Sequence, residues 1–166
     1  MTMASERCEP RDCLEAVTAR TSASLADVSD LELAGVWTNG GGLAGNILYL
    51  FPDRTYIYTE WADIQPETIY DKGHWQVAGG VLLMRPDADV FWTPRSDRRY
   101  LCLESGQQGL LLLGIDLAVG WFTELAEEHP EIATPVEWLQ ATALKREKRL
   151  NGRDGRLLKT SLLKRS

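Results

Sequence analysis

The sequence predicts a mainly β protein, an antiparallel barrel with a C-terminal α-helix. Two observations favour the barrel. A Gly-x-Trp triplet occurs twice, at residues 35–37 and 73–75, and the apolar residues come in short runs divided by glycine and proline. One observation favours the helix, because residues 134–152 carry a start signal, a stop signal and an apolar stripe.

The bulk properties are those of one folded domain. The 166 residues are 44% hydrophobic and 25% charged, which is ordinary for a globular chain. No apolar run reaches the roughly 18–20 residues of a membrane span. The N-terminus, MTMASERCEPRDC, lacks the apolar stretch of a signal peptide. We therefore expect a cytoplasmic protein with no transmembrane segment.

Changes in composition divide the chain into four regions. The first is polar and is expected to form an arm or a short helix near residues 13–19. The expected regions are an N-terminal arm over 1–32, the barrel over 33–122, a helical segment over 123–152 and a basic tail over 153–166.

The strands of the expected barrel follow from β-forming residues and turn chemistry. Residues 46–51 and 55–61 flank a Pro-Asp turn and predict a first hairpin. Residues 73–84 predict a second hairpin, because Gly79-Gly80 can adopt the positive φ angles of a tight primed turn. Further short strands are expected over 89–93, 99–105 and 109–116. Two loops are expected between strands, a glycine-rich one over 39–45 and an acidic one over 60–72.

The helix after the barrel has boundary residues at both ends. Thr134 can cap it, Pro135 suits the first helical position, and Glu137 completes a capping box. Asn151-Gly152 then reads as its C-terminal stop. The sequence therefore predicts a helix over 135–150, packed outside the barrel or across one end.

Charge is unevenly distributed. The net charge is −6, yet residues 145–166 carry nine Lys or Arg against two acidic residues, so the rest of the chain carries −13. We expect the tail, with its leucines at 157–158 and 162–163, to dock on the acidic barrel of its own chain or of a second copy, the latter giving a homodimer. Nucleic acid is not an expected partner, because residues 139–166 lack the aromatic rings on which bases stack.

Four short motifs resemble those of lipocalin-like, or calycin-type, small β-barrel domains. The resemblance covers about residues 33–115, although Arg54 stands where the pattern has glycine and no late-strand arginine is evident to stack on Trp37. It implies a cavity or an open barrel mouth and implies no reaction. The motifs are residues 35–37, 51–56, 73–75 and 79–83.

Aromatic side chains provide the candidate binding residues. Trp37 and Trp75 are expected to fill the barrel interior. Neighbouring residues on a strand point to opposite faces, so His74 should face outward if Trp75 faces inward. Aromatic residues near strand ends can line a mouth and stack on a ligand. The candidate ligand-binding residues are Tyr56, Tyr58, Trp61, Phe91, Trp92 and His74.

No catalytic or metal-binding motif is present, so we expect no catalytic residue, metal or cofactor. The three cysteines are an odd number, which favours free thiols. Cys102, on a strand between two leucines, reads as buried filler, and His74 and His129 lie too far apart to mark a metal site. An acidic set in the 60–72 loop could supply a general acid–base pair, or could be merely solvated. This set is Glu60, Asp63, Glu67 and Asp71.

Three functions remain open, in order of preference. The first is a non-catalytic barrel that binds a hydrophobic or aromatic small molecule. The second is an acidic interaction protein, such as an immunity factor or antitoxin, that blocks a basic protein partner. The third is a barrel cyclase or isomerase whose cavity folds its substrate, assisted by Glu60, Asp63 and His74.

Overall fold

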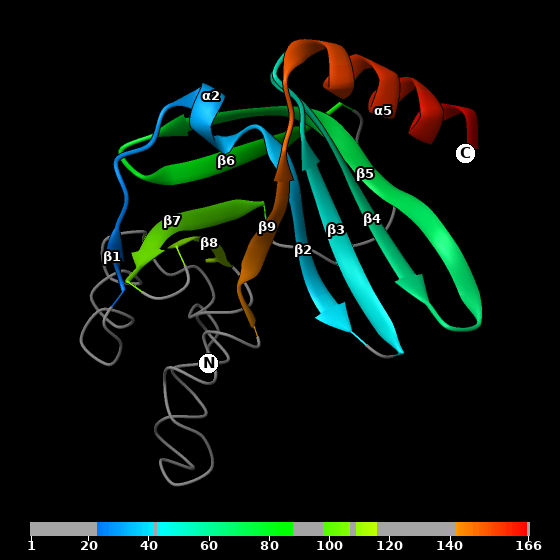
Figure 1. The fold of residues 1–166 in the computed structure, drawn as a ribbon, viewed down its shortest axis with the longest axis horizontal. Helices are drawn as coiled ribbons and strands as arrows, with labels where there is room; N and C mark the ends of the chain where they lie inside the picture. The colour runs from blue at the N-terminus through cyan, green and yellow to red at the C-terminus, as the bar shows by residue number, and fades with distance from the viewer. Residues whose placement is uncertain (1–22, 42, 88–97, 107–108, 116–141, 166) are drawn as a thin grey trace, which may run out of the picture. The chain divides into compact units, whose positions relative to one another are not determined.

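The computed structural model describes residues 23–41, 43–87, 98–106, 109–115 and 142–165. Within this part of the chain, β8 pairs with both β9 and β7, so β2–β9 form a closed antiparallel barrel of eight strands, and β1 adds to β7 (Figure 1). The predicted mainly β barrel with a C-terminal helix is confirmed. The elements are β1 Ser24–Leu25, α2 Asp30–Leu33, β2 Gly35–Gly41, β3 Ala44–Leu50, β4 Thr55–Ala62, β5 Gln65–Ala78, β6 Val81–Pro86, β7 Arg99–Ser105, β8 Gly109–Gly114, β9 Leu144–Arg149 and α5 Gly152–Arg165.

The chain divides into two compact units. The first contains β1, β7, β8 and the first residues of β6. Here β7 pairs with β8 in register, with Cys102 opposite Leu112, and the amide of Cys102 donates to the carbonyl of Gly80 at 2.8 Å. Most side chains of β7 and β8 are buried on both faces.

The second unit contains α2, β2–β4, most of β5, β9 and α5. The predicted hairpin of residues 46–51 and 55–61 is confirmed as β3 and β4, with Leu48 opposite Tyr58. The predicted turn at Gly79-Gly80 is also confirmed, since it joins β5 to β6 and both φ angles are positive. Both expected loops are wrong, because residues 39–41 belong to β2 and residues 65–72 belong to β5.

Arg54, which stands where the resembling motif has glycine, has a left-handed backbone conformation. Its φ of 69° is the only positive value among the non-glycine residues that the structure describes. Two hydrogen bonds hold the backbone of Arg54 in this conformation. Its amide donates to the carbonyl of Phe51, and its carbonyl accepts from the amide of Trp75, both at 2.9 Å. Its side chain forms an ion pair with Asp30.

The prediction of a helix over 135–150 is wrong in its last part, since Leu144–Arg149 form β9; residues 135–141 lie outside the described residues. β9 pairs with β2, with Arg149 opposite Gly35. β9 forms hydrogen bonds with the backbone amides and carbonyls of β2. The sequence around β9 carries no sign of this pairing, because β2 is distant in the chain. Asn151 begins a helix rather than ending one, because its side chain accepts from the amide of Asp154 at 2.8 Å.

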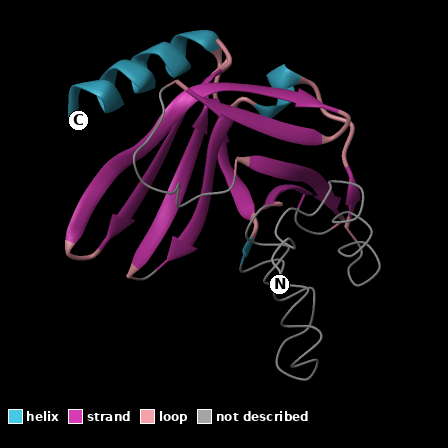
Figure 2. Cartoon of the chain, turned by 180° about the vertical axis from the view of Figure 1, so that it is seen from behind, coloured by secondary structure: helices cyan, strands magenta, loops and turns pink. Residues whose placement is uncertain are grey.

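The basic tail docks on its own chain, as one of the two expected arrangements had it. Its helix α5 lies over the strands of the second unit (Figure 2). Leu150 and Leu162 pack there, with Leu158 at the edge, against a cluster of side chains from β2–β4 and the turn after β3. The cluster contains Val36, Tyr49, Phe51 and Ile57, with Ile47 and Ile69 at its edge.

Among the helices that the structure describes, none combines the length and hydropathy that a membrane span requires.

Candidate functional site

The sheet of β2–β5 has two faces with different chemistry. Side chains alternate between the faces along a strand, and directly paired residues share a face. One face carries the cluster that packs against α5, and we call it the outer face. The opposite one is the inner face, and its residues pair across β2–β5. Its buried side chains are Trp37, Leu48, Leu50, Tyr56, Tyr58, Asp71 and Trp75.

One end of the inner face is fastened by helix α2. The indole of Trp37 donates to the carbonyl of Leu33 at 3.0 Å. The guanidinium of Arg146 lies 5.1 Å from the centroid of the Trp37 ring and donates to the carbonyl of Glu32. A capping box between Ser29 and Glu32 fixes the start of the helix. A late-strand arginine therefore stacks on Trp37, contrary to the expectation from the sequence.

Two tyrosine–carboxylate pairs lie in the middle of the inner face. The hydroxyl of Tyr56 donates to Asp71 at 2.8 Å, and that of Tyr58 donates to Glu60 at 2.9 Å. The side-chain amide of Asn46 donates to the hydroxyl of Tyr58 at 3.2 Å. Asp71 is nearly buried, and a buried carboxylate is tolerated only when it accepts hydrogen bonds of this kind.

The far end of the inner face carries a polar rim, which we define as Asn39, Asn46, Glu60 and Thr68. These residues are opposite one another on four successive strands, because Asn39 pairs with Asn46, Asn46 with Glu60, and Glu60 with Thr68. All four are partly exposed, whereas the residues toward α2 are buried. The inner face thus runs from an aromatic and aliphatic floor to a polar, solvent-reached edge.

The six candidate ligand-binding residues are divided by the fold. Tyr56 and Tyr58 lie together on the inner face. Trp61 lies on the outer face, where its ring covers Gly45 so closely that an added Cβ there would be 2.9 Å from it. Phe91 and Trp92 lie outside the described residues.

His74 points outward, as the alternation with buried Trp75 predicts. Its side chain is 66% exposed, and its Nδ1 lies 3.1 Å from an oxygen of Asp87. It therefore lies on the face opposite Tyr56 and Tyr58.

The expected acidic set is likewise divided. Glu60 and Asp71 lie on the inner face, Asp63 lies in the turn after β4, and Glu67 accepts from Tyr49 and Thr59 on the outer face. The fold therefore does not gather the four carboxylates into one loop.

Asn39, Asn46 and Arg146 are not among the residues predicted from the sequence. Asn46 alternates with two leucines of β3 on the inner face, so strand periodicity could have found it. Arg146 carried no comparable signal, because its partner Trp37 is distant in the chain.

Reactive groups are scarce in the part of the chain that the structure describes. No group of three or more His, Cys, Asp or Glu residues there could hold a metal ion. Cys102 is fully buried, as predicted, and burial raises the pKa of its thiol to about 12, so the nucleophilic thiolate is disfavoured.

Comparison with protein families, with curated proteins and with solved structures gives no match for this chain. The properties of the inner face must therefore be read from its own residues.

Proposed function

We propose that this protein is a lipocalin-like barrel that binds a hydrophobic or aromatic small molecule against the inner face, without catalysis. The observation that carries the proposal is the polarity of that face. Buried aromatic rings and leucines end in the partly exposed polar rim at one edge, while α2 fastens the other. Small-molecule sites combine a mostly apolar lining with a few fixed polar groups in this way.

The tyrosine pairs supply the fixed polar groups. If these positions served only to fill the core, apolar side chains would cost less free energy to bury than tyrosine–carboxylate pairs do. Because Glu60 and Asn46 both bond to Tyr58, the hydroxyl is held in one orientation. A ligand that enters at the polar rim would therefore meet prepositioned polar atoms on Asn46 and Glu60, which lowers the entropy cost of binding.

The pair of Trp37 and Arg146 supports the lipocalin-like part of the proposal. The resemblance seen in the sequence lacked a late-strand arginine over the tryptophan of the first Gly-x-Trp triplet. Arg146 occupies that place, on the last strand of the barrel. It also joins β9 to α2, through the carbonyl of Glu32.

A neutral fluorescent probe, 1-N-phenylnaphthylamine, tests the binding proposal. Fluorescence titration of the folded protein should give saturable binding. Thr68→Trp, which adds bulk at the polar rim, should weaken it at least tenfold, and Tyr58→Phe should weaken it severalfold. His74→Trp is the matched control, because it places a tryptophan on the outward side of the same strand, and it should bind as the wild type does.

Two results would overturn the proposal. One is the absence of saturable binding by the folded wild type. The other is equal affinity of the Thr68→Trp and His74→Trp variants, since the probe would then lie elsewhere. Native mass spectrometry of protein purified from its own host would identify a retained natural ligand by its mass.

A further inference from the structure

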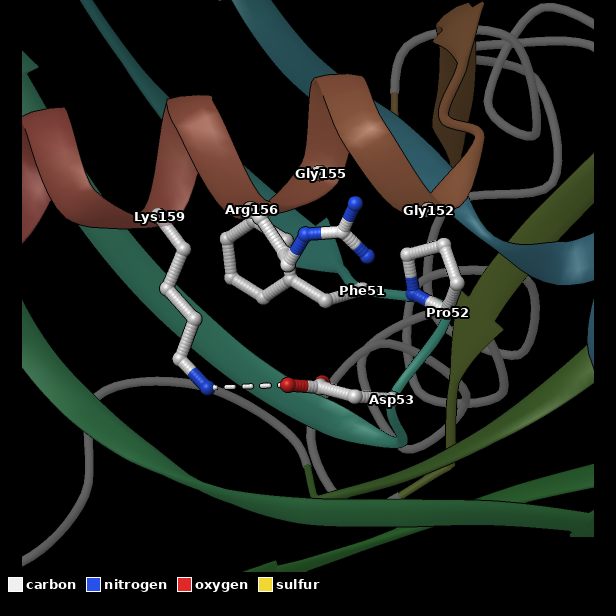
Figure 3. Close-up of a pocket in the computed structure, with 7 residues that line it drawn as sticks. All are labelled: Phe51, Pro52, Asp53, Gly152, Gly155, Arg156 and Lys159. Atoms are coloured by element: carbon white, nitrogen blue, oxygen red, sulfur yellow. Dashed lines mark hydrogen bonds and ion pairs between the residues drawn. The ribbon is translucent and has the colours of Figure 1, made fainter.

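A pocket lies away from the inner face, between the turn after β3 and the first turns of α5 (Figure 3). Its volume is about 300 Å³, at the lower end of the range for small-molecule sites. One wall comes from the turn and the other from the helix. The lining residues are Phe51, Pro52, Asp53, Gly152, Gly155, Arg156 and Lys159.

The apolar part of this pocket is built by close packing. Gly155 is buried against Pro52, and a Cβ at Gly155 would lie 2.9 Å from Cδ of the proline ring. The Phe51 side chain is buried and extends beneath the helix (Figure 3). Gly152, by contrast, is exposed and has no side chain, so a flat group could enter beside it and lie against Pro52.

The charged part of the pocket contains two cations and one anion. The Lys159 ammonium donates to Asp53 at 3.1 Å and to the hydroxyl of Thr55 at 2.8 Å, and it lies 5.8 Å from the centroid of the Phe51 ring. Asp53 is therefore already neutralised by Lys159. Arg156 is exposed and has no ion-pair partner among the described residues, and its guanidinium reaches toward Pro52 (Figure 3).

The surroundings strengthen the positive charge. Arg153 is exposed on the first turn of α5, whose N-terminal end carries the positive pole of the helix dipole. Asp154 is the opposing charge in that turn, and its carboxylate accepts from the side chain of Asn151 at 3.0 Å. The mouth of the pocket therefore favours an anion, while its floor favours an apolar ring.

We infer that this pocket binds a small organic anion with a flat apolar body, of the aromatic carboxylate class. The ring would lie against Pro52 beside the exposed Gly152, and the carboxylate would pair with the guanidinium of Arg156, which suits it through two parallel hydrogen bonds. Lys159 holds the Asp53 turn in place and neutralises the carboxylate that would otherwise repel the anion. This pocket is separate from the proposed ligand site on the inner face.

Titration with 2-naphthoate, followed by ¹H–¹⁵N NMR, tests the inference. Saturable shifts are expected for the amides of Asp53, Gly152 and Gly155. Arg156→Gln should weaken binding about tenfold, the usual scale for losing a charge-assisted pair. Lys164→Gln is the matched control, because it removes one exposed charge from the last turn of α5, away from the pocket.

The same titration separates this pocket from the inner face. The Thr68→Trp variant should bind 2-naphthoate as the wild type does. The neutral analogue 2-naphthol should bind about tenfold more weakly than 2-naphthoate to the wild type. Equal affinities of Arg156→Gln and Lys164→Gln would overturn the inference, as would equal affinities of the two naphthalene compounds or shifts confined to amides of the inner face.

Discussion

Arg146 of β9 stacks on Trp37 of β2, with its guanidinium 5.1 Å from the centroid of the indole ring. The same side chain donates to the carbonyl of Glu32, which is 114 positions away in the sequence. The last strand of the barrel is thereby tied to its first strand and to helix α2. Burial and the neighbouring charge of Arg149 lower the pKa of Arg146, but a guanidinium stays charged at neutral pH.

Replacing Arg146 with methionine should destabilise the fold by about 1–3 kcal/mol, because the variant loses a cation–π contact and a charged hydrogen bond while it keeps the aliphatic stem. Urea unfolding followed by tryptophan fluorescence measures the change. Arg149→Met is the control at an exposed position of the same strand and should stay within about 0.5 kcal/mol of the wild type. Equal losses in the two variants would contradict the role of the Trp37 contact.

Tyr49 should make the stability fall at alkaline pH. Burial raises its pKa above the ordinary value, and the hydrogen bond and negative charge of Glu67, 2.5 Å from the hydroxyl, raise it further. A group with a raised folded-state pKa stabilises the protein below its unfolded pKa, about 10 for tyrosine, and this contribution is lost as the pH rises above that value. The free energy of unfolding between pH 8 and 11 should therefore fall more steeply for the wild type than for Tyr49→Phe. Parallel curves would contradict this assignment.

Asp53 should make a matching contribution at acid pH. Partial burial raises its pKa, but hydrogen bonds from Thr55 and Lys159 outweigh this and lower the pKa below its ordinary value. A lowered folded-state pKa stabilises the protein above the unfolded pKa, about 3.9, and this contribution is lost as the pH falls through the folded value. Asp53→Asn should show a smaller loss of stability than the wild type between pH 5 and 2, measured by thermal unfolding. A steeper loss in the variant would show that the sign is wrong.

Gly155→Ala should weaken the docking of α5. Alanine favours a helix by about 1 kcal/mol over glycine, but its Cβ would lie 2.9 Å from the ring of Pro52. Overpacking of this kind costs about 1–3 kcal/mol, so we expect a net loss of stability. Gly152→Ala is the control, because its nearest neighbour is the flexible end of Arg156 at 3.5 Å, and it should be neutral or stabilising in urea unfolding. A stabilised Gly155→Ala variant would indicate that Pro52 moves aside.

Cys102 should be unreactive in the native protein. Its side chain is fully buried and burial raises its pKa to about 12, so neither access nor the thiolate form is available. In a variant with Cys8 and Cys13 replaced by serine, modification by a thiol reagent at pH 8 should proceed at the rate of global unfolding. Rapid modification without added denaturant would show that β7 opens locally.

Local sequence was sufficient for the hairpins and failed for β9. The hairpin between β3 and β4 depends on a turn and on flanking β-formers, all close in the chain. The sequence from Leu144 to Arg149 has no apolar face of either period, and its neighbours resemble a helix. What makes it a strand is the hydrogen-bonding edge of β2, to which the chain returns from far along the sequence.

The candidate site shows the same division. Alternation along β4 places Tyr56 and Tyr58 on one face, and the sequence alone could supply that much. The same alternation places Trp61 on the opposite face, but it could not show which of the two faces α5 covers, because the tertiary structure determines that. The Arg156 pocket carried no sequence signal, since its two walls are elements far apart in the chain that are joined by packing and by the ion pair of Lys159 with Asp53.

The sequence by itself determined the strand periodicity, the Gly79-Gly80 turn, the burial of Trp37 and Trp75 and the amphipathic character of the tail. These follow from side-chain period and backbone freedom, which act over a few residues. Only the tertiary structure decided that Arg146 covers Trp37, that Asp71 accepts from Tyr56 and that Lys159 reaches Asp53. Strand register and helix docking bring the two groups of each contact together. Register and docking are in turn fixed by the free energy of burying apolar surface, which is summed over the whole core.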